Sequence, residues 1–304
     1  MRVVLLSGGG GGARFARGLR DVLGPGELTV VANVGDDVEI LGLHVSPDLD
    51  GVLYALAGLV DDERGWGRAG ESWHALESAS AWGGADWFRL GDRDLGLHLV
   101  RTERLCAGRP LSAVTADLVD RAGIEVTLLP ASDDPLRTRV RTPGGEYSFQ
   151  EWYVGRRHAD EVDEVLVVGA ESARPAPGVV EAIAIADAVL IAPSNPFLSI
   201  GPILGVAGIR RALLERRARC VAVSPLIGGE AVTGPLGRML SRMAGGTTPA
   251  HVAGRYEGLL DALVIDEADA PAEALVELVV APLRMTDRDA EQRLATTALE
   301  VACG

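Results

Sequence analysis

The sequence predicts an α/β fold, a Rossmann-like three-layer arrangement with helices on both faces of a parallel sheet and a smaller inserted cap. Three observations support this. Apolar runs of strand length alternate with helical patterns, several of these runs are continuously apolar, and 47% of the 304 residues are hydrophobic. Continuously apolar strands are typical of a sheet that is buried on both faces. The expected strands are Val3–Leu6, Leu28–Ala32, Val126–Leu129, Val165–Val168, Ala188–Ala192, Cys220–Val223 and Ala262–Ile265.

Two segments interrupt the alternation and predict the cap. Residues 61–122 are mainly helical in pattern and are rich in tryptophan, and residues 138–153 are expected to form a hairpin around a Pro-Gly-Gly turn. We therefore expect residues 1–60 and 123–304 to form a Rossmann-like nucleotide-binding core. Residues 61–122 would be a helical insertion with the hairpin beside it. A closing helix is predicted over 286–302, with Asp287 in its first turn.

Composition excludes several classes of function. The formal net charge is −14, and all 29 basic residues other than histidine are arginines. Mechanisms that need a lysine are therefore excluded, and an acidic chain is a poor partner for nucleic acid. No apolar run approaches the ~18 residues of a membrane span, and the start is too polar for a secretory signal. Three separated cysteines indicate reduced thiols in a cytoplasmic protein.

Five successive glycines follow the first strand and precede a helix predicted over residues 13–23. Glycines let a ligand approach the backbone, and the N–H groups at a helix start bind phosphate oxygens. The alternative is a tight turn without a ligand. A rigid polar turn, Pro193-Ser194-Asn195-Pro196, follows another strand, and ligands collect at such strand ends. The candidate donor and nucleotide contacts are Gly8, Gly9, Gly10, Gly11, Gly12, Arg14, Ser194 and Asn195.

Carboxylates follow the second strand. Asn33 stands where a dinucleotide-binding fold has its ribose-binding acid, and Asp36 and Asp37 come later, which weakens a nicotinamide interpretation. Asp48 and Asp50 occupy the next helix start, where acids also suit the helix dipole. Carboxylates beside a phosphate loop predict Mg²⁺; the alternative is a solvated acidic turn. The predicted metal ligands are Asp36, Asp37 and Asp50.

The insertion carries a third group of polar and aromatic residues. Trp87 and Phe88 either stack on a flat heterocycle or belong to the core. Asp94, His98 and Arg101 share one face of a predicted helix, which either meets a ligand or only stabilises the helix. No histidine pair has metal-binding spacing and no G-x-S-x-G elbow is present, so zinc hydrolysis and serine-hydrolase chemistry are unsupported.

Taken in order, these segments resemble the 2-phospho-L-lactate transferase (CofD-type) family, including its actinobacterial phosphoenolpyruvate-linked branch. The matching stretches run from end to end of the chain: Gly8–Phe15, Asn33–Asp37, Pro47–Asp50, Trp87–Arg101, Leu129–Asp134, Phe149–Trp152, Ala192–Ser199, Ser224–Gly228 and Met285–Asp287. Glu230 and Thr233 stand where some relatives have basic or neutral residues, so we make no prediction of a charge contact by the loop that begins at Ser224.

The resemblance implies a step in coenzyme F420 biosynthesis. A phospholactyl or phosphoenolpyruvyl group would move from its guanosine diphosphate ester to the terminal hydroxyl of the deazaflavin Fo, with release of GMP. The resemblance also implies Mg²⁺ and a homodimer. The sequence leaves open whether the acid is lactyl, enolpyruvyl or glyceryl. The alternative function is a non-enzymatic, nucleotide-sugar-binding regulatory protein of the same superfamily, and the segments 87–101 and 149–152 favour the transferase.

The predicted site residues follow from these roles. Because the chain lacks a lysine or a serine–histidine arrangement, we expect direct in-line attack without a covalent intermediate, with Asp50 or Asp92 accepting the proton. The predicted catalytic residues are Asp36, Asp50 and Asp92. The predicted acceptor contacts are Asp48, Trp87, Phe88, Asp92, His98, Phe149 and Gln150.

Overall fold

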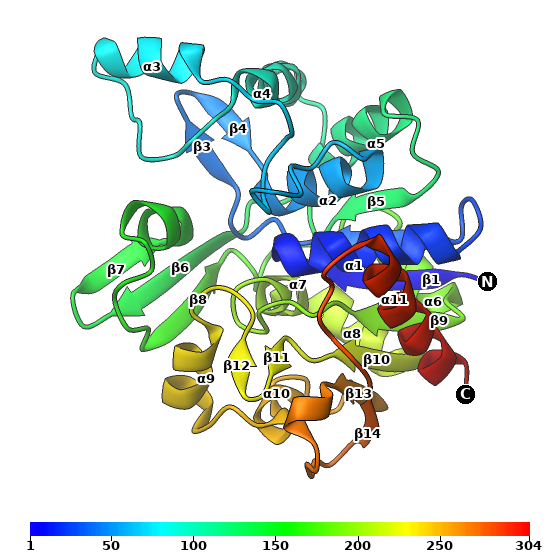
Figure 1. Ribbon diagram of the computed structural model, residues 1–304. Coiled ribbons are helices and arrows are strands. Elements are labelled where there is room, and N and C mark those ends of the chain that lie inside the picture. The colour runs from blue at the N-terminus through cyan, green and yellow to red at the C-terminus, as the bar shows by residue number, and fades with distance from the viewer.

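The computed structural model describes residues 1–304 and has a seven-stranded parallel sheet at its centre (Figure 1). The strand order is β14-β13-β10-β9-β1-β2-β5. Its strands are β1 (Val3–Ser7), β2 (Leu28–Ala32), β5 (Thr127–Pro130), β9 (Ala188–Ile191), β10 (Arg219–Val223), β13 (Ala262–Ile265) and β14 (Glu277–Val280). The predicted α/β fold class is confirmed.

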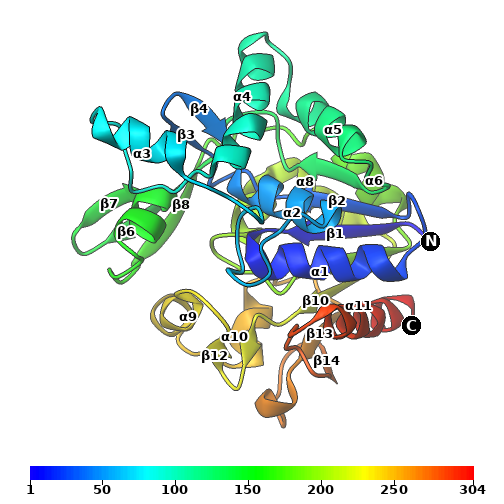
Figure 2. The same cartoon turned by 45° about the horizontal axis from the view of Figure 1, so that its top comes forward.

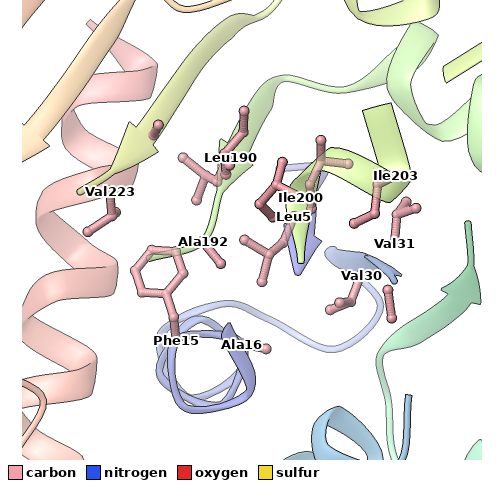
Figure 3. Packing of buried hydrophobic residues seen from close by; sticks show 14 of the residues in the cluster. Leu5, Phe15, Ala16, Val30, Val31, Leu190, Ala192, Ile200, Ile203 and Val223 are labelled. Carbon is pink, nitrogen blue, oxygen red and sulfur yellow. The ribbon is translucent and has the colours of Figure 1, made fainter. Parts of the chain in front are cut away.

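Helices cover both faces of this sheet. One face carries α1 (Gly9–Val22), α2 (Pro47–Ala57) and α11 (Arg288–Cys303). The other carries α6 (Val179–Ile185), α7 (Ile200–Gly205) and α8 (Ala207–Glu215). Figure 3 shows Phe15 and Ala16 of α1 on one side of Leu5 and Leu190, and Ile203 of α7 on the other. Burial on both faces explains why the central strands are continuously apolar.

The chain adds strands to the sheet on both sides of β1. It first builds β2 and β5 on one side, and then returns to build β9, β10, β13 and β14 on the other. Leu5 of β1 therefore lies between Val30 of β2 and Leu190 of β9. The loops after β1 and β9 diverge at this point, and open α/β sheets bind ligands in the crevice that results.

The remaining elements gather mostly beyond the carboxyl ends of the strands (Figure 1 and Figure 2). They include the hairpin β3 (Val38–Ile40) and β4 (Leu43–Val45), the helices α3 (His74–Ala81) and α4 (Asp92–Cys106), and the π-helical turn η1 (Glu151–Gly155). β11 (Leu226–Ile227), β12 (Glu230–Ala231), α9 (Leu236–Ala244) and α10 (Pro249–Gly254) follow β10, and η2 (Glu267–Asp269) follows β13. Within the segment 61–122, α5 (Leu111–Arg121) instead packs on β5.

Two predictions about strands were wrong. The run 165–168 was expected in the parallel sheet, but β8 (Glu164–Val168) pairs antiparallel with β6 (Arg137–Thr142), which also pairs with β7 (Gly145–Ser148). Its side chains are only partly buried and Val168 is exposed, so its apolar run does not reflect burial on two faces. The edge strand β14 was missed because it is short and none of its side chains is fully buried, so it lacks the continuous apolar run of the central strands.

The closing helix was predicted correctly in place. Asp287 caps α11 from the position before its first turn, and its carboxylate accepts from the Ala290 N–H at 2.8 Å. A buried ion pair between Arg17 and Glu291, 2.6 Å long, joins α11 to α1. None of the helices combines the length and apolar character that crossing a bilayer demands.

Candidate functional site

The glycines after β1 form the first turn of α1 instead of a separate loop, so the predicted helix start was four residues late. α1 begins at Gly9, whose φ of +69° is readily adopted only by glycine. The N–H groups in the first turn of a helix have no partner within the helix. This turn lies at the carboxyl end of β1, where strand order reverses, and it therefore presents backbone donors to the crevice.

Packing explains three of the five glycines. A Cβ atom at Gly8, Gly11 or Gly12 would lie within 2.8 Å of an atom in a neighbouring segment. At Gly10 the nearest atom would be 3.6 Å away, and this residue is exposed. Close packing therefore requires glycine at three positions, while the exposed backbone at Gly10 leaves the predicted ligand contact a prediction.

The turn after β9 closes against the same helix start. The Ser194 hydroxyl donates to the Gly8 carbonyl oxygen at 2.6 Å. The side-chain oxygen of Asn195 accepts from the N–H groups of Phe197 (2.9 Å) and Leu198 (3.1 Å). The two residues predicted to contact the donor thus lie at the crevice, where they also hold its backbone in place.

Asp36 and Asp48 form a buried acid pair beside the glycine turn. The Asn33 side-chain amide donates to both carboxylates, at 3.0 Å to Asp48. The Gly9 N–H donates to the other oxygen of Asp48 at 2.7 Å. Burial raises the pKa of Asp48 to about 6. Burial, together with repulsion from Asp48 and Asp37, raises the pKa of Asp36 well above its usual range.

This acid pair brings together residues from the loop after β2 and the start of α2. No arginine pairs with either carboxylate, so two like charges face each other with only neutral donors around them. Such an arrangement favours a bound cation or proton. The structure contains no group of three histidine, cysteine or acidic side chains placed to hold a metal by themselves, whereas Mg²⁺ commonly uses one or two carboxylates together with substrate phosphates and waters.

Asp37 lies beside the pair but has its own partners. One of its oxygens accepts from the Ser46 hydroxyl at 2.9 Å and lies 2.9 Å from the His44 ring nitrogen Nε2. The other oxygen is buried and has no partner. Burial raises the pKa of Asp37 and His44 opposes that effect. Asp37 therefore retains one free oxygen near the predicted metal position.

Asp50 is arranged differently from the acid pair. The Arg101 guanidinium spans both oxygens of its carboxylate, with one N–H···O distance of 2.9 Å. Both side chains are almost wholly buried, and ring nitrogen Nδ1 of His98 lies 3.8 Å from Asp50. Arg101 already compensates the charge of Asp50, so this geometry does not favour the predictions that Asp50 binds the metal or accepts the proton.

The face of α4 that contains Asp94, His98 and Arg101 points into the protein towards α2. All three residues are buried. Burial lowers the pKa of His98 to about 4 and raises that of Asp94 to about 6. The Tyr54 hydroxyl and one oxygen of Asp94 are buried without partners. His98, a predicted acceptor contact, thus lies between α4 and α2 rather than on an open surface, and only 2% of its surface is exposed.

The Asp92 carboxylate accepts hydrogen bonds from the start of α3 and from the residue Ser72 before it. The Ser72 hydroxyl donates at 2.6 Å, and the N–H groups of Ala75 and His74 donate at 3.0 Å and 3.1 Å. The Ser72 hydrogen bond is the largest cause that lowers the pKa of Asp92. A carboxylate with a lowered pKa and several donors is a weak base, so this geometry also speaks against the predicted catalytic role of Asp92.

The predicted aromatic residues come from two segments that meet. Trp87 packs edge-to-face on Phe88 with ring centroids 5.7 Å apart. A Cβ atom at Gly155 in η1 would lie 3.5 Å from the Trp87 ring, so the insertion contacts the segment after β7. On that segment the Gln150 amide donates to the Asp36 carbonyl oxygen at 3.2 Å, and Phe149 is largely buried.

Arg14 lies on the first turns of α1 and is only loosely held. Its nearest hydrogen-bond acceptor is the Met285 carbonyl oxygen, at 3.5 Å. Its guanidinium also lies near Gly65, because a Cβ atom there would be 3.7 Å from Arg14 Nη2. Arg14 therefore keeps several donors available beside the glycine turn, and its contact with a phosphate stays a prediction.

An open pocket lies on the β10 side of the crevice, with a volume of about 760 Å³. Its lining comes from β11–β12, α9 and neighbouring turns: Glu161, Gly229, Glu230, Ala231, Gly234, Pro235, Gly237, Arg238, Ser241, Arg242 and Thr247. Sequence reasoning did not identify this pocket. It also missed Tyr153, which follows directly after the matched stretch 149–152; only its place in a run of aromatic residues could have indicated it.

Known proteins resemble this chain over nearly its whole length. Residues 3–303 match the family model described as 2-phospho-L-lactate transferase CofD. Curated relatives named phosphoenolpyruvate transferase include those of Streptomyces coelicolor (46% identical, covering 99% of this chain and 98% of the relative) and Nocardia farcinica (45% identical, 99% and 95%). A solved structure of a UPF0052 family protein from Bacillus halodurans matches at 17% identity, with a TM-score of 0.64 and coverage of 98% and 100%; it supports the fold.

Proposed function

Because the chain belongs to the 2-phospho-L-lactate transferase CofD family, we propose that it transfers a phospho-acid group from a guanosine diphosphate ester to the terminal hydroxyl of Fo and releases GMP. The relatives named phosphoenolpyruvate transferase are 43–47% identical over nearly the whole chain. On that basis we propose that the acid is enolpyruvyl and that the product is dehydro coenzyme F420-0.

The acid pair beside the glycine turn is the observation that carries the proposal. Two buried carboxylates without a counter-charge, next to the first turn of a helix, suit a diphosphate together with a divalent cation. We propose that Asp36 and Asp48 hold Mg²⁺, with the free oxygen of Asp37 beside them. The cation would neutralise phosphate charge. Asp50 is left out of this set because Arg101 occupies both of its oxygens.

The chain's own groups would bind and orient the donor. The first-turn N–H groups of α1 and the Arg14 guanidinium would hold the phosphates. The open pocket beside α9 has space for a nucleoside such as guanosine. Because phosphoryl transfer depends mainly on position and charge neutralisation, these contacts would align the phosphorus with the attacking hydroxyl.

The acceptor would lie against the aromatic residues on the other side of the crevice. Trp87 and Phe149 come from segments that meet near the acid pair, so a flat ring could rest on the insertion while its side chain reaches the carboxylates. Asp50 and Asp92 are engaged by protein donors. We therefore propose neither of them as the base: a phosphoryl transition state asks little of one, and the hydroxyl proton would pass to solvent.

The test is a direct assay of the purified protein with Fo, Mg²⁺ and the guanosine diphosphate esters of phosphoenolpyruvate, phospholactate or phosphoglycerate. Mass spectrometry should detect dehydro F420-0 and GMP, formed fastest from the enolpyruvyl donor. Faster reaction of another ester would overturn the choice of acid. Thermal stabilisation by nucleotide sugars, without turnover of Fo by any ester, would instead indicate the regulatory alternative.

A further inference from the structure

A strained aromatic segment follows β7 and borders the acid pair. η1 is a π-helical turn, a rare conformation that is frequent at functional sites. Arg157 and His158, which follow this turn, have φ angles of +52° and +42°. Left-handed conformations cost of order 1 kcal/mol for residues other than glycine, and they persist only where surrounding contacts hold them.

Contacts from the core and from α9 hold this segment. The His158 N–H donates to the Trp152 carbonyl oxygen at 2.8 Å, and the Trp152 indole N–H donates to the Asp160 carbonyl oxygen at 3.2 Å. Arg238 of α9 donates to the carbonyl oxygens of His158 (2.6 Å) and Ala159 (3.2 Å). Trp152 is completely buried, so the strained turn is held in one conformation.

The segment positions Tyr153. Its ring stacks on Phe149 with centroids 5.1 Å apart, and the His158 ring lies 5.0 Å away. A Cβ atom at Gly234 would lie 3.3 Å from the phenol oxygen, so the hydroxyl faces the turn between β12 and α9. The side chain is partly buried, and its hydroxyl makes no hydrogen bond within the protein. The strained turn therefore orients a free hydroxyl.

The charge around this hydroxyl determines how it can act. Burial raises the pKa of Tyr153, and the nearby carboxylates of Asp48 and Asp36 raise it further. The phenol therefore stays protonated at neutral pH and can donate a hydrogen bond. The adjacent acid pair, once ionised, can only accept. Tyr153 stacks on Phe149, and the residue after Phe149, Gln150, donates to the Asp36 carbonyl oxygen, so a polyol chain that joins a ring near Phe149 to a hydroxyl at the acid pair would pass close to Tyr153.

We propose that the Tyr153 hydroxyl donates a hydrogen bond to an internal hydroxyl of the acceptor's ribityl chain and so aligns the terminal hydroxyl for attack. This inference rests on the proposed function and assigns a residue that selects for a polyol acceptor. The strained backbone serves this contact, because it holds the ring of Tyr153 between Phe149 and the turn at Gly234.

The experiment compares Tyr153→Phe with a matched control, Tyr147→Phe. The Tyr147 hydroxyl donates to the Gly144 carbonyl oxygen at 3.2 Å on the outer hairpin. Each protein is assayed with Fo and with a deazaflavin that bears an unbranched 5-hydroxypentyl chain, which keeps the terminal hydroxyl but lacks the internal ones. Binding of each acceptor is also measured by fluorescence titration without donor.

Tyr153→Phe should lower kcat/KM for Fo about three- to tenfold, as expected for one lost hydrogen bond, with the KM of the donor unchanged. With the alkyl acceptor, Tyr153→Phe and the unchanged protein should react at equal rates, and Tyr147→Phe should behave like the unchanged protein throughout. The melting temperature should not change, because the removed hydroxyl has no protein partner.

Two results would overturn the inference. An equal loss with both acceptors would indicate a packing role, and an unchanged kcat/KM for Fo would show that the hydroxyl makes no useful contact. If the proposed function is wrong, the result differs: the unchanged protein neither binds Fo nor transfers a group to it. That result would also rule out the role proposed for Tyr153.

Discussion

Asp48 and Asp50 lie in the same first turn of α2, and both are buried, yet their surroundings differ completely. Arg101 compensates the charge of Asp50 across both carboxylate oxygens. Asp48 has only neutral donors, the Gly9 N–H and the Asn33 amide, and it faces a second carboxylate in Asp36.

This difference separates an acid that supports the structure from an acid that is available to a ligand. The pair of Asp50 and Arg101 joins α2 to α4 and leaves little charge to attract anything else. The pair of Asp36 and Asp48 carries repulsion that a bound cation would relieve, so it lowers the stability of the unliganded protein. Binding sites commonly have this property, because groups arranged for a ligand are imperfectly satisfied without it.

The largest expected effect is on turnover when the acid pair is altered. Asp36→Asn or Asp48→Asn should reduce the transfer rate by about a thousandfold, because charge neutralisation at the phosphates is usually the largest catalytic contribution. Circular dichroism should show an unchanged fold. The surface variant Asp120→Asn is the matched control. Near-normal rates at low Mg²⁺ concentration would refute the role of the pair.

The next largest effect is on stability at Asp50. Asp50→Asn leaves the Arg101 guanidinium buried without a counter-charge, which should lower the free energy of unfolding by about 3–5 kcal/mol. Urea denaturation measures this loss. Replacing both partners with apolar residues, Asp50→Leu with Arg101→Met, should recover most of it. If Asp50→Asn were as stable as the unchanged protein but inactive, Asp50 would regain its predicted place in the active site.

A smaller effect concerns pH. A carboxylate whose pKa is higher in the folded than in the unfolded protein contributes stability at low pH that is lost as pH rises through the folded value. For Asp48 this window runs from the ordinary value of 3.8 to about 6, and the shift of Asp36 has the same direction. Asp36→Asn should therefore stabilise the metal-free protein at pH 8 by about 1 kcal/mol.

That gain should disappear near pH 4, where the carboxylates of the unchanged protein are protonated. Calorimetric melting of both proteins at pH 4 and pH 8 checks the sign. Added Mg²⁺ should raise the melting temperature of the unchanged protein at pH 8 and have little effect at pH 4. A stabilisation that does not vary with pH would show that repulsion within the pair is not its cause.

The smallest effect is expected at Asp92. Asp92→Ala removes the acceptor for two N–H groups at the start of α3, which should cost about 1 kcal/mol of stability, as for other helix caps. The transfer rate should stay within about twofold if the carboxylate has only this role. A rate loss of a hundredfold, with the same small change in stability, would restore Asp92 as a catalytic residue.

Several features of the site can be predicted from the sequence alone. The glycine run after β1, the polar turn at Ser194 and the acids after β2 were assigned to the carboxyl edge of a parallel sheet, and the structure places them there. Parallel strands make this possible, because every loop that follows a strand emerges at the same edge. The roles predicted for Asp50 and Asp92 were harder to assign, since a carboxylate looks the same in sequence whether or not an arginine or a helix start engages it.

The sequence by itself determined the α/β class, the positions along the chain of most central strands and the family, because apolar periodicity and motif order are properties of the chain alone. Only the tertiary structure decided which acids are paired. Arg101 reaches Asp50 from a helix far along the chain, while Asn33 brings Asp36 and Asp48 together. It also decided where Tyr153 points, since a π-helical turn and two left-handed residues place its hydroxyl at the turn between β12 and α9. Contacts between distant segments and local departures from regular geometry leave no periodic signal in a sequence.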